Sequence, residues 1–207
     1  MRTTARKSAG FSHVVDLIEG IYNGLQPAVN ILVLIGGCSR SGKSTVAQQL
    51  GSSLVSRGVD SILVPADHWL FPASQRQAGT TVLKRYRHEE LSDSVISLLR
   101  GQTISVKPYD AKTRELNPRS IAIGAKPTPF VVIVEGVITL AVRQLREFSA
   151  LNIFVESGDC TRVRRLISFY RDFKLMGKLE YKELIKDREI EEVPFIKSTM
   201  QFADIIF

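Results

Sequence analysis

Residues 36–45, GGCSRSGKST, have the types and the spacing of a loop that binds phosphate groups. The pattern G-x-x-x-x-G-K-[S/T] begins at Gly37 and ends at Ser44. In such a loop, backbone N–H groups surround the phosphates, the lysine reaches the β- and γ-phosphates, and the serine hydroxyl binds Mg²⁺. The predicted nucleotide-binding residues are Gly37, Cys38, Ser39, Arg40, Ser41, Gly42, Lys43, Ser44 and Thr45.

Two carboxylates follow apolar segments further along the chain. Asp67 follows SILVPA, and a carboxylate there can accept the proton of an attacking hydroxyl or hold water around the metal. Glu135 follows VVIV, and four apolar residues followed by an acid are a usual pattern for a carboxylate that lies near the bound metal in such folds. Gly136 comes next and, without a side chain, allows other groups to approach this position closely. A turn-capping role for Asp67 and a structural role for Glu135 are the alternatives. We therefore predict Lys43 and Asp67 as catalytic residues, and Ser44, Asp67 and Glu135 as metal ligands.

The segment between residues 162 and 178 is strongly basic. It contains six basic residues and one acid, Asp172, whereas a solvated helix face more often mixes both signs. Arginines on a mobile helix pair can close over the donor phosphates and neutralise charge during transfer. We predict a helical lid over about residues 162–190, with Arg165 and Arg171 as catalytic arginines, and a basic surface helix is the alternative. The six basic residues are Arg162, Arg164, Arg165, Arg171, Lys174 and Lys178.

These residues need a scaffold that brings distant segments to one edge. Short runs rich in Val and Ile alternate with helical patterns, as expected for a parallel sheet with helices on both faces. Ligands bind beyond the carboxyl ends of such strands, so the phosphate loop, Asp67 and Glu135 should share one edge. The predicted helices span 11–25, 44–57 and 89–100. The predicted strands span 30–36, 61–67, 102–110, 130–136, 151–157 and 203–207.

The length and composition of the chain favour one domain, residues 1–207. With 44% hydrophobic and 24% charged residues, the chain suits a globular fold, and residues 1–28 are predicted to form a tail and a helix. No apolar run approaches the roughly 18 residues of a membrane span, and the first residues do not resemble a secretory signal. Two cysteines are too few for a disulfide framework, which favours a reducing cytoplasm. Because the chain stops inside an apolar run, we expect the natural protein to continue beyond Phe207.

The net charge of +7 raises the question of an anionic partner. A site for nucleotide phosphates is itself basic, and the sequence has no stripe of Lys and Arg interleaved with aromatic residues of the kind that binds single strands. We therefore expect no nucleic-acid partner. The sequence also lacks the Asn-Lys-x-Asp motif by which GTPases read guanine and the Asp-x-x-Gly motif of their switch.

From about residue 31 to its end, the chain resembles the family of uridine kinases and phosphoribulokinases. The resemblance implies a P-loop NTPase fold, which is a three-layer α/β fold with a mostly parallel central sheet and a helical lid. It also implies a base at Asp67, a metal-side carboxylate at Glu135 and an acceptor-binding segment at Tyr109–Asp110. The predicted acceptor-binding residues are Asp67, Trp69, Tyr109 and Arg114. The matching segments are GGCSRSGKST, PADHW, VKPYDAKTRE, VVIVEGV, IFVESGDCTRVRR, FYRD and FADIIF.

The departures from the family pattern fall mainly on the acceptor side. Uridine kinases usually have a Phe-Asp-His-Pro-like segment where this chain has RYRHEELSD (85–93), and a histidine where it has Arg114. The lid has LMGK (175–178) instead of Arg-Gly-Arg, and DHWLFP is similar to a segment of pantothenate kinase. The residues expected to bind the phosphate donor still match the family pattern. The residues by which the family contacts a nucleoside cannot be assigned directly to positions of this chain.

We therefore predict a kinase that uses ATP and Mg²⁺ to phosphorylate a hydroxyl of a small metabolite, with uridine or cytidine as the leading acceptor. A sugar, a sugar phosphate or a pantothenate-like alcohol is the alternative acceptor. A nucleotide-binding regulator without catalysis is the alternative from a different class. The expected partners are ATP and the acceptor, without nucleic acid or membrane, and the oligomeric state stays open.

Overall fold

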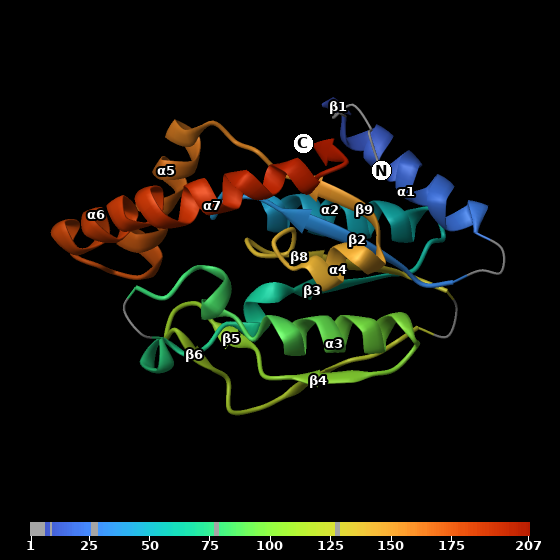
Figure 1. The fold of residues 1–207 in the computed structure, drawn as a ribbon, viewed down its shortest axis with the longest axis horizontal. Helices are drawn as coiled ribbons and strands as arrows, with labels where there is room; N and C mark the ends of the chain where they lie inside the picture. The colour runs from blue at the N-terminus through green and yellow to red at the C-terminus, as the bar shows by residue number, and fades with distance from the viewer. Residues whose placement is uncertain (1–6, 9, 26–28, 77–78, 127–128) are drawn as a thin grey trace.

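The computed structural model describes residues 7–8, 10–25, 29–76, 79–126 and 129–207. Its centre is a six-stranded sheet in which neighbouring strands are parallel (Figure 1). This arrangement confirms the predicted α/β fold. In sheet order the strands are β1 (Lys7–Ser8), β10 (Ile205–Ile206), β9 (Ser149–Phe154), β2 (Ile31–Gly36), β8 (Val131–Glu135) and β3 (Ser61–Pro65).

The central strands β2 and β8 form because their Val, Ile and Leu side chains are buried on both faces of the sheet. All six residues of β2 are buried, and so are the first four residues of β8. Ile35 of β2 is in register with Glu135 of β8, which is in register with Pro65 of β3. The three strands therefore end side by side, at the edge where the sequence analysis predicted the site.

Helices cover both faces of the sheet and make it the middle layer of three. On one face, α1 (Phe11–Gly24) and α2 (Lys43–Ser56) share a buried apolar cluster with alternate residues of β2. On the other face, the remaining β2 residues share a cluster with α3 (His88–Leu99), α4 (Arg143–Phe148) and α7 (Val193–Ser198). The side chains of β2 divide between the two clusters because a strand has a period of two residues. Within the described ranges, the helices are too short and too polar to cross a membrane.

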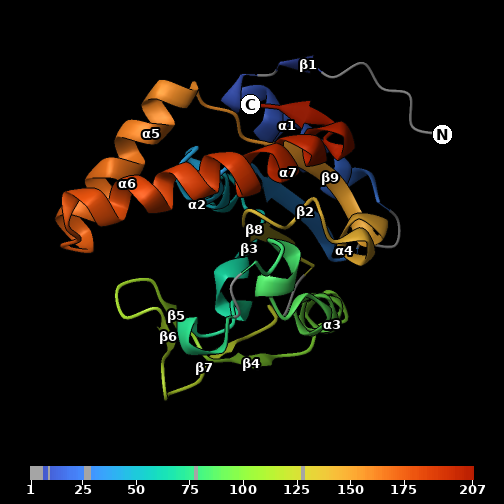
Figure 2. The same cartoon turned by 60° about the vertical axis from the view of Figure 1, so that its left-hand side comes forward.

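The predicted lid corresponds to α5 (Asp159–Ser168) and α6 (Lys178–Asp187), each followed by a π-helical turn, Phe169–Phe173 and Arg188–Glu192. Figures 1 and 2 show α5 and α6 extending past the carboxyl-end edge of the sheet. This unit has a small buried cluster of its own, separate from the two main clusters, formed by Leu166, Tyr170, Tyr181 and Ile185.

The strand prediction was wrong for residues 102–110, which we expected to join the main sheet. Pro108 has no N–H to donate in a continuous strand, and the carboxylate of Asp110 accepts hydrogen bonds from the N–H groups of Lys112 (2.7 Å) and Thr113 (3.4 Å). This turn reverses the chain and forms a hairpin. The residues that follow complete two small antiparallel pairs, β4 (Ile104–Val106) with β7 (Ile121–Ile123) and β5 (Tyr109–Asp110) with β6 (Glu115–Leu116).

Short elements complete the chain. We expected the first residues to form a tail, but Lys7–Ser8 pairs with β10 at the edge of the sheet. Residues 1–6, 9 and 26–28 of the predicted tail and helix lie outside the described residues. The 3₁₀ turns are η1 (Ala66–Trp69), η2 (Ala73–Gln75), η3 (Leu83–Arg85) and η6 (Thr199–Phe202).

Candidate active site

The phosphate loop connects the end of β2 to the start of α2, as its pattern predicts. Gly37 has a φ of 137°, and a Cβ atom there would lie 2.3 Å from the backbone oxygen of Val155. Only glycine fits this approach. Lys43 opens α2 and is 6% exposed, and its Nζ donates a hydrogen bond to the backbone oxygen of Cys38 at 2.8 Å. The ammonium group therefore lies against the loop that would hold the phosphates.

Charges next to the loop set the protonation of Lys43. Burial lowers the pKa of Lys43, whereas the carboxylates of Glu135 and Asp67 act in the opposite direction. The two carboxylates thus favour the ammonium form that binds phosphate. This interaction also shows that the three predicted groups lie within electrostatic range of one another, although they follow three different strands.

Glu135 is the last residue of β8, and its Oε1 accepts a hydrogen bond from the Ser44 hydroxyl at 3.0 Å. Burial raises the pKa of Glu135, Lys43 lowers it and Asp67 raises it. Gly136 follows directly, and a Cβ atom there would lie 2.6 Å from the Cβ of Ala66. The absence of a side chain at Gly136 therefore lets the end of β8 approach the turn that contains Asp67.

The pair of Ser44 and Glu135 suits Mg²⁺, which binds one or two carboxylates and takes its other oxygen ligands from phosphate and water. Across the described ranges, no group of three or more His, Cys, Asp or Glu side chains could hold a metal alone. A metal at this position would thus depend on the phosphates of a bound nucleotide, as the chemistry of a phosphate loop requires.

Asp67 lies in η1, two residues after β3 ends, and the Tyr86 hydroxyl donates a hydrogen bond to its Oδ1 at 3.2 Å. Tyr86 is buried, and burial raises its pKa well above the ordinary value, with the charge of Asp67 adding to the shift. Tyr86 therefore stays protonated and acts as a fixed donor to the carboxylate. The sequence analysis did not predict this partner, because a single tyrosine in a polar segment gives no signal.

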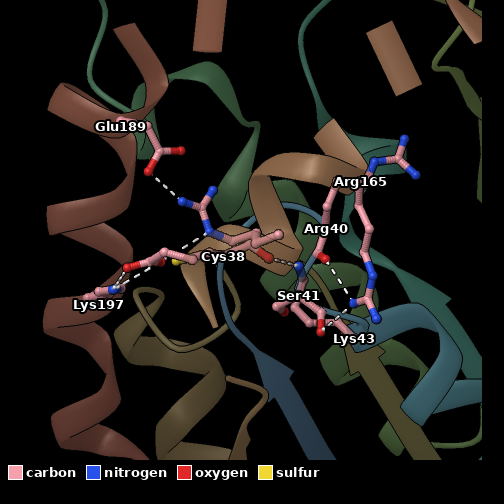
Figure 3. A network of polar contacts seen from close by, with 9 residues as sticks. Cys38, Arg40, Ser41, Lys43, Arg165, Glu189 and Lys197 are labelled. Carbon is pink, nitrogen blue, oxygen red and sulfur yellow. Dashed lines mark hydrogen bonds and ion pairs between the residues drawn. The ribbon is translucent and has the colours of Figure 1, made fainter. Parts of the chain in front are cut away.

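The lid residues fall into two groups in the structure. Arg165 reaches the phosphate loop, where its Nη1 donates to the backbone oxygens of Arg40 (3.3 Å) and Ser41 (3.4 Å), as Figure 3 shows. Arg171 instead forms an ion pair with its neighbour Asp172 at 2.6 Å, and both are exposed. We had predicted both arginines as catalytic, and the structure places only Arg165 in contact with the loop.

The six basic residues of the predicted lid have different surroundings in the structure. Arg162 is 1% exposed and forms ion pairs with Asp159 and Glu189, so it joins the first lid helix to the π-helical turn that follows the second. Asp159 also pairs with Lys197 of α7 at 3.0 Å. These contacts give Arg162 a structural role at the base of the lid.

Arg188 is a site residue that the sequence analysis included in the lid range but did not single out. Its Nη1 donates to the hydroxyl of Ser39 in the phosphate loop at 3.0 Å, and it pairs with Glu192 at 3.5 Å. Arg188 and Glu192 have the i,i+4 spacing that is common for ion pairs on exposed helix surfaces. From the sequence, Arg188 therefore looks like an ordinary surface residue, and its contact with the loop cannot be predicted. Arg40 of the loop in turn places its guanidinium 3.7 Å from the ring centre of Phe169 in the lid.

The predicted acceptor residues divide between the core and the hairpin. Trp69 is 3% exposed and belongs to the main apolar cluster, which leaves almost none of its surface free for contact with an acceptor. Tyr109 lies on β5, and its hydroxyl accepts a hydrogen bond from Arg76 Nη2 at 2.8 Å. Arg114 is exposed in the turn between β5 and β6, and its carbonyl accepts from the N–H of Ala73 at 2.9 Å.

Residues 32–207 match the model of the phosphoribulokinase/uridine kinase family. The chain belongs to this family. A uridine kinase of Halalkalibacterium halodurans is 26% identical over 189 residues, which cover 85% of this chain and 84% of the relative. A uridine kinase of Leuconostoc citreum is 28% identical over 199 residues, with 88% of each chain covered. Membership makes the chain a kinase of the P-loop type and implies ATP, usually with Mg²⁺, and a small-molecule acceptor.

Solved structures of kinases share the fold of this family member. A protein from Silicibacter sp. TM1040 assigned as a fructose transport system kinase has a TM-score of 0.71 at 19% identity, over 94% of this chain and 98% of that one. D-glycerate 3-kinase from Cryptococcus neoformans has a TM-score of 0.57 at 11% identity, over 86% of each chain. At 19% and 11% identity, these similarities show a shared fold and nothing about the acceptor of this chain.

Proposed function

We propose that this chain transfers the γ-phosphoryl group of ATP to a hydroxyl of a small metabolite, with Asp67 as the general base. One observation carries the proposal. Lys43 begins the helix after β2, Glu135 ends β8 and Asp67 follows β3, so the three groups lie at one edge of the sheet, where the two carboxylates act on the pKa of Lys43. A protein that only senses nucleotide needs the phosphate loop, but it has no use for a second carboxylate placed to receive a proton.

Each residue then has a defined task. The loop and Lys43 would bind the β- and γ-phosphates, and Ser44 and Glu135 would hold a metal ion, which would neutralise phosphate charge. Asp67 takes the proton of the acceptor hydroxyl while Tyr86 fixes its orientation. The acceptor oxygen forms a bond to the γ-phosphorus, the bond to the bridging oxygen of ADP breaks, and the proton passes from Asp67 to water.

The first acceptors to consider are uridine and cytidine. Relatives named uridine kinase are 24–29% identical to this chain, which supports a nucleoside acceptor. A second candidate class is an alcohol with an anionic group, which is favoured by the positive charge of Arg114 and Lys174 on the acceptor side. The proposed phosphoryl transfer is common to both.

Acceptor-dependent release of ADP tests the proposal. Purified protein with ATP and magnesium is screened against uridine, cytidine, free sugars, sugar phosphates, pantothenate and glycerate, and we expect at least one alcohol to accelerate ADP release. Lys43→Ala should abolish that release, because the ammonium group neutralises phosphate charge. The matched control is Lys182→Ala, since Lys182 is exposed on α6. ADP release that no alcohol accelerates would contradict the proposal and favour a regulator.

A further inference from the structure

The acceptor side of the site contains a group of basic side chains from three separate segments. Arg76 follows η2, Arg114 lies in the hairpin turn, and Lys174 lies just after the π-helical turn of the lid. We call these three residues the acceptor-side cations. They are separated by up to about a hundred residues in sequence, and so their proximity depends on the fold.

Hydrogen bonds bring the three segments together. The N–H of Ala73 donates to the carbonyl of Arg114 at 2.9 Å, which joins the hairpin to the segment that contains Arg76. Lys174 Nζ donates to the carbonyl of Lys112 at 3.0 Å, which joins the lid to the same hairpin. The hairpin therefore holds together the three segments that carry these cations.

These three cations have no carboxylate within ion-pair distance among the residues that the structure describes. Asp110, at the start of the hairpin turn, uses its Oδ1 to accept two backbone N–H groups of its own turn, and Glu115, the neighbour of Arg114, accepts a hydrogen bond from the Ser74 hydroxyl at 3.5 Å. Gathering like charges without a counter-ion is unfavourable, and surfaces that do so commonly bind an anion.

The charges also act on one another. Burial lowers the pKa of Lys174, the positive charges of Arg114, Arg188 and Arg76 lower it further, and only Asp110 acts against them. Arg188 is the residue that contacts Ser39 of the phosphate loop. Arg188 thus acts electrostatically on Lys174 and also contacts the phosphate loop, whereas the acceptor-side cations belong to segments outside that loop.

A pocket of about 480 Å³ opens beside Arg76 and has Lys84 in its wall. This volume suits a small metabolite. Its described wall includes Phe71, Gln75 and Thr81, and it contains no Asp or Glu. The segment that lines the pocket begins at Phe71, two residues after η1 ends.

We propose that the acceptor alcohol has an anionic group, a phosphate or a carboxylate, that binds to Arg76, Arg114 and Lys174 while its hydroxyl faces Asp67. Guanidinium groups recognise both anions with paired hydrogen bonds. The inference rests on the proposed function and narrows its acceptor from any small alcohol to an anionic one. A neutral nucleoside offers these cations no partner, so uridine becomes the poorer of the two acceptor classes.

Pairs of alcohols that differ in an anionic group test this inference. The pairs are glycerate and glycerol, pantothenate and pantothenol, and ribulose 5-phosphate and ribulose, each assayed by ADP release at fixed ATP and magnesium. In at least one pair, we expect the anionic member to have a kcat/KM at least about tenfold above its neutral partner and above uridine, the size of one charge-assisted hydrogen bond. The phosphate and carboxylate pairs tell the two anions apart.

Variants of Arg114 locate the binding group. Because Arg114 is exposed, Arg114→Gln should fold, and we expect it to raise the KM for the anionic acceptor about tenfold or more while the KM for ATP stays within about twofold. Arg114→Lys should retain part of the affinity. Arg143→Gln is the control, because Arg143 lies exposed on α4 in a pair with Glu147.

The outcomes separate this inference from the proposed function. Acceptor-dependent ADP release with uridine as the best substrate and no effect of Arg114→Gln would overturn the anionic acceptor and leave the kinase standing. A rise in the KM for ATP alone would assign the cations to the donor and would also overturn the inference. If no alcohol of either kind accelerates ADP release, the proposed function fails, and the acceptor inference fails with it.

Discussion

Replacing Asp67 by Asn removes the basic oxygen of the proposed general base and changes the shape of the site very little. Tyr86 donates its hydroxyl to Oδ1 at 3.2 Å, and the amide oxygen of an asparagine can accept the same bond. General-base assistance typically contributes about a hundredfold to ten-thousandfold, which corresponds to about 3 to 5 kcal/mol in the barrier. We therefore expect kcat to fall at least about a hundredfold.

The affinity for ATP should change little in the same variant. In the proposed mechanism, the phosphates bind to the loop after β2 and to Lys43, whereas Asp67 follows β3. Steady-state measurements of kcat and of both Michaelis constants separate the two effects, so that a lost base lowers kcat at an unchanged KM for ATP. A variant that phosphorylates its acceptor at a rate near that of the wild type would refute the assignment and leave Glu135 as the remaining candidate.

Two controls distinguish a base from a structural or metal-holding carboxylate. Tyr86→Phe removes the donor to Asp67 but keeps the ring in the core, and we expect a loss of about fivefold, the value of one hydrogen bond of about 1 kcal/mol. If Asp67 mainly holds the metal through water, excess magnesium or manganese should restore part of the rate of Asp67→Asn. A missing base should not respond to added metal.

Further expectations follow from the same geometry. Glu135→Gln should raise the magnesium concentration for half-maximal rate at least about tenfold, because a ligand is lost, and an unchanged magnesium curve would contradict the metal role of Glu135. Burial raises the pKa of Glu135 above 4.5, the value of an ordinary glutamate, so magnesium binding to the wild type should already weaken at a pH above 4.5 during acidification. If magnesium binding weakens only at or below pH 4.5, the effect of burial on Glu135 is contradicted. The exposed Cys160 should react with Ellman's reagent in the native protein, whereas Cys38, whose pKa is raised by burial, should react only after denaturation, and two reactive thiols in the native state would refute this difference. Gly37→Ala should lower Tm by several degrees or prevent folding, because of its clash with a backbone oxygen, and an unchanged Tm and ATP affinity would show that the loop tolerates a side chain. Trypsin cleavage within residues 159–187 should slow when ATP is added, and equal rates with and without ATP would contradict a lid that closes on nucleotide.

The main sheet could be predicted because its strands are buried on both faces. Five of the six predicted strands occur in it, since an uninterrupted Val and Ile run has few other stable positions in a globular fold. The sixth, residues 102–110, has only Ile104 and Val106 of this kind. It also contains Pro108, which has no N–H, and Asp110, whose carboxylate accepts the hydrogen bonds of a turn. A two-residue strand such as β1 has no periodicity to detect.

The site could be predicted only where its residues follow strand ends or belong to the phosphate loop. Lys43 and Glu135 have this kind of local signal, because their neighbours in sequence determine where they lie. Arg188 contacts Ser39 across 149 residues, and a contact of that range leaves no pattern in either segment. The same reason applies to Arg162, which forms an ion pair with Glu189 at the other end of the lid. A count of basic residues in the segment 162–178 does not include this carboxylate, so it overestimates the net charge available to phosphates.

The fate of the γ-phosphoryl group tests the central claim most directly. Protein, magnesium and ATP labelled with radioactive phosphorus in the γ-position are incubated with the best acceptor of the screen, and the products are separated. The account predicts that the label moves to the acceptor in an amount equal to the ADP formed, and that Asp67→Asn loses this transfer while still binding ATP. Label that appears only as inorganic phosphate, at the same rate with and without the acceptor, would contradict the assignment of this chain as a kinase of a small alcohol.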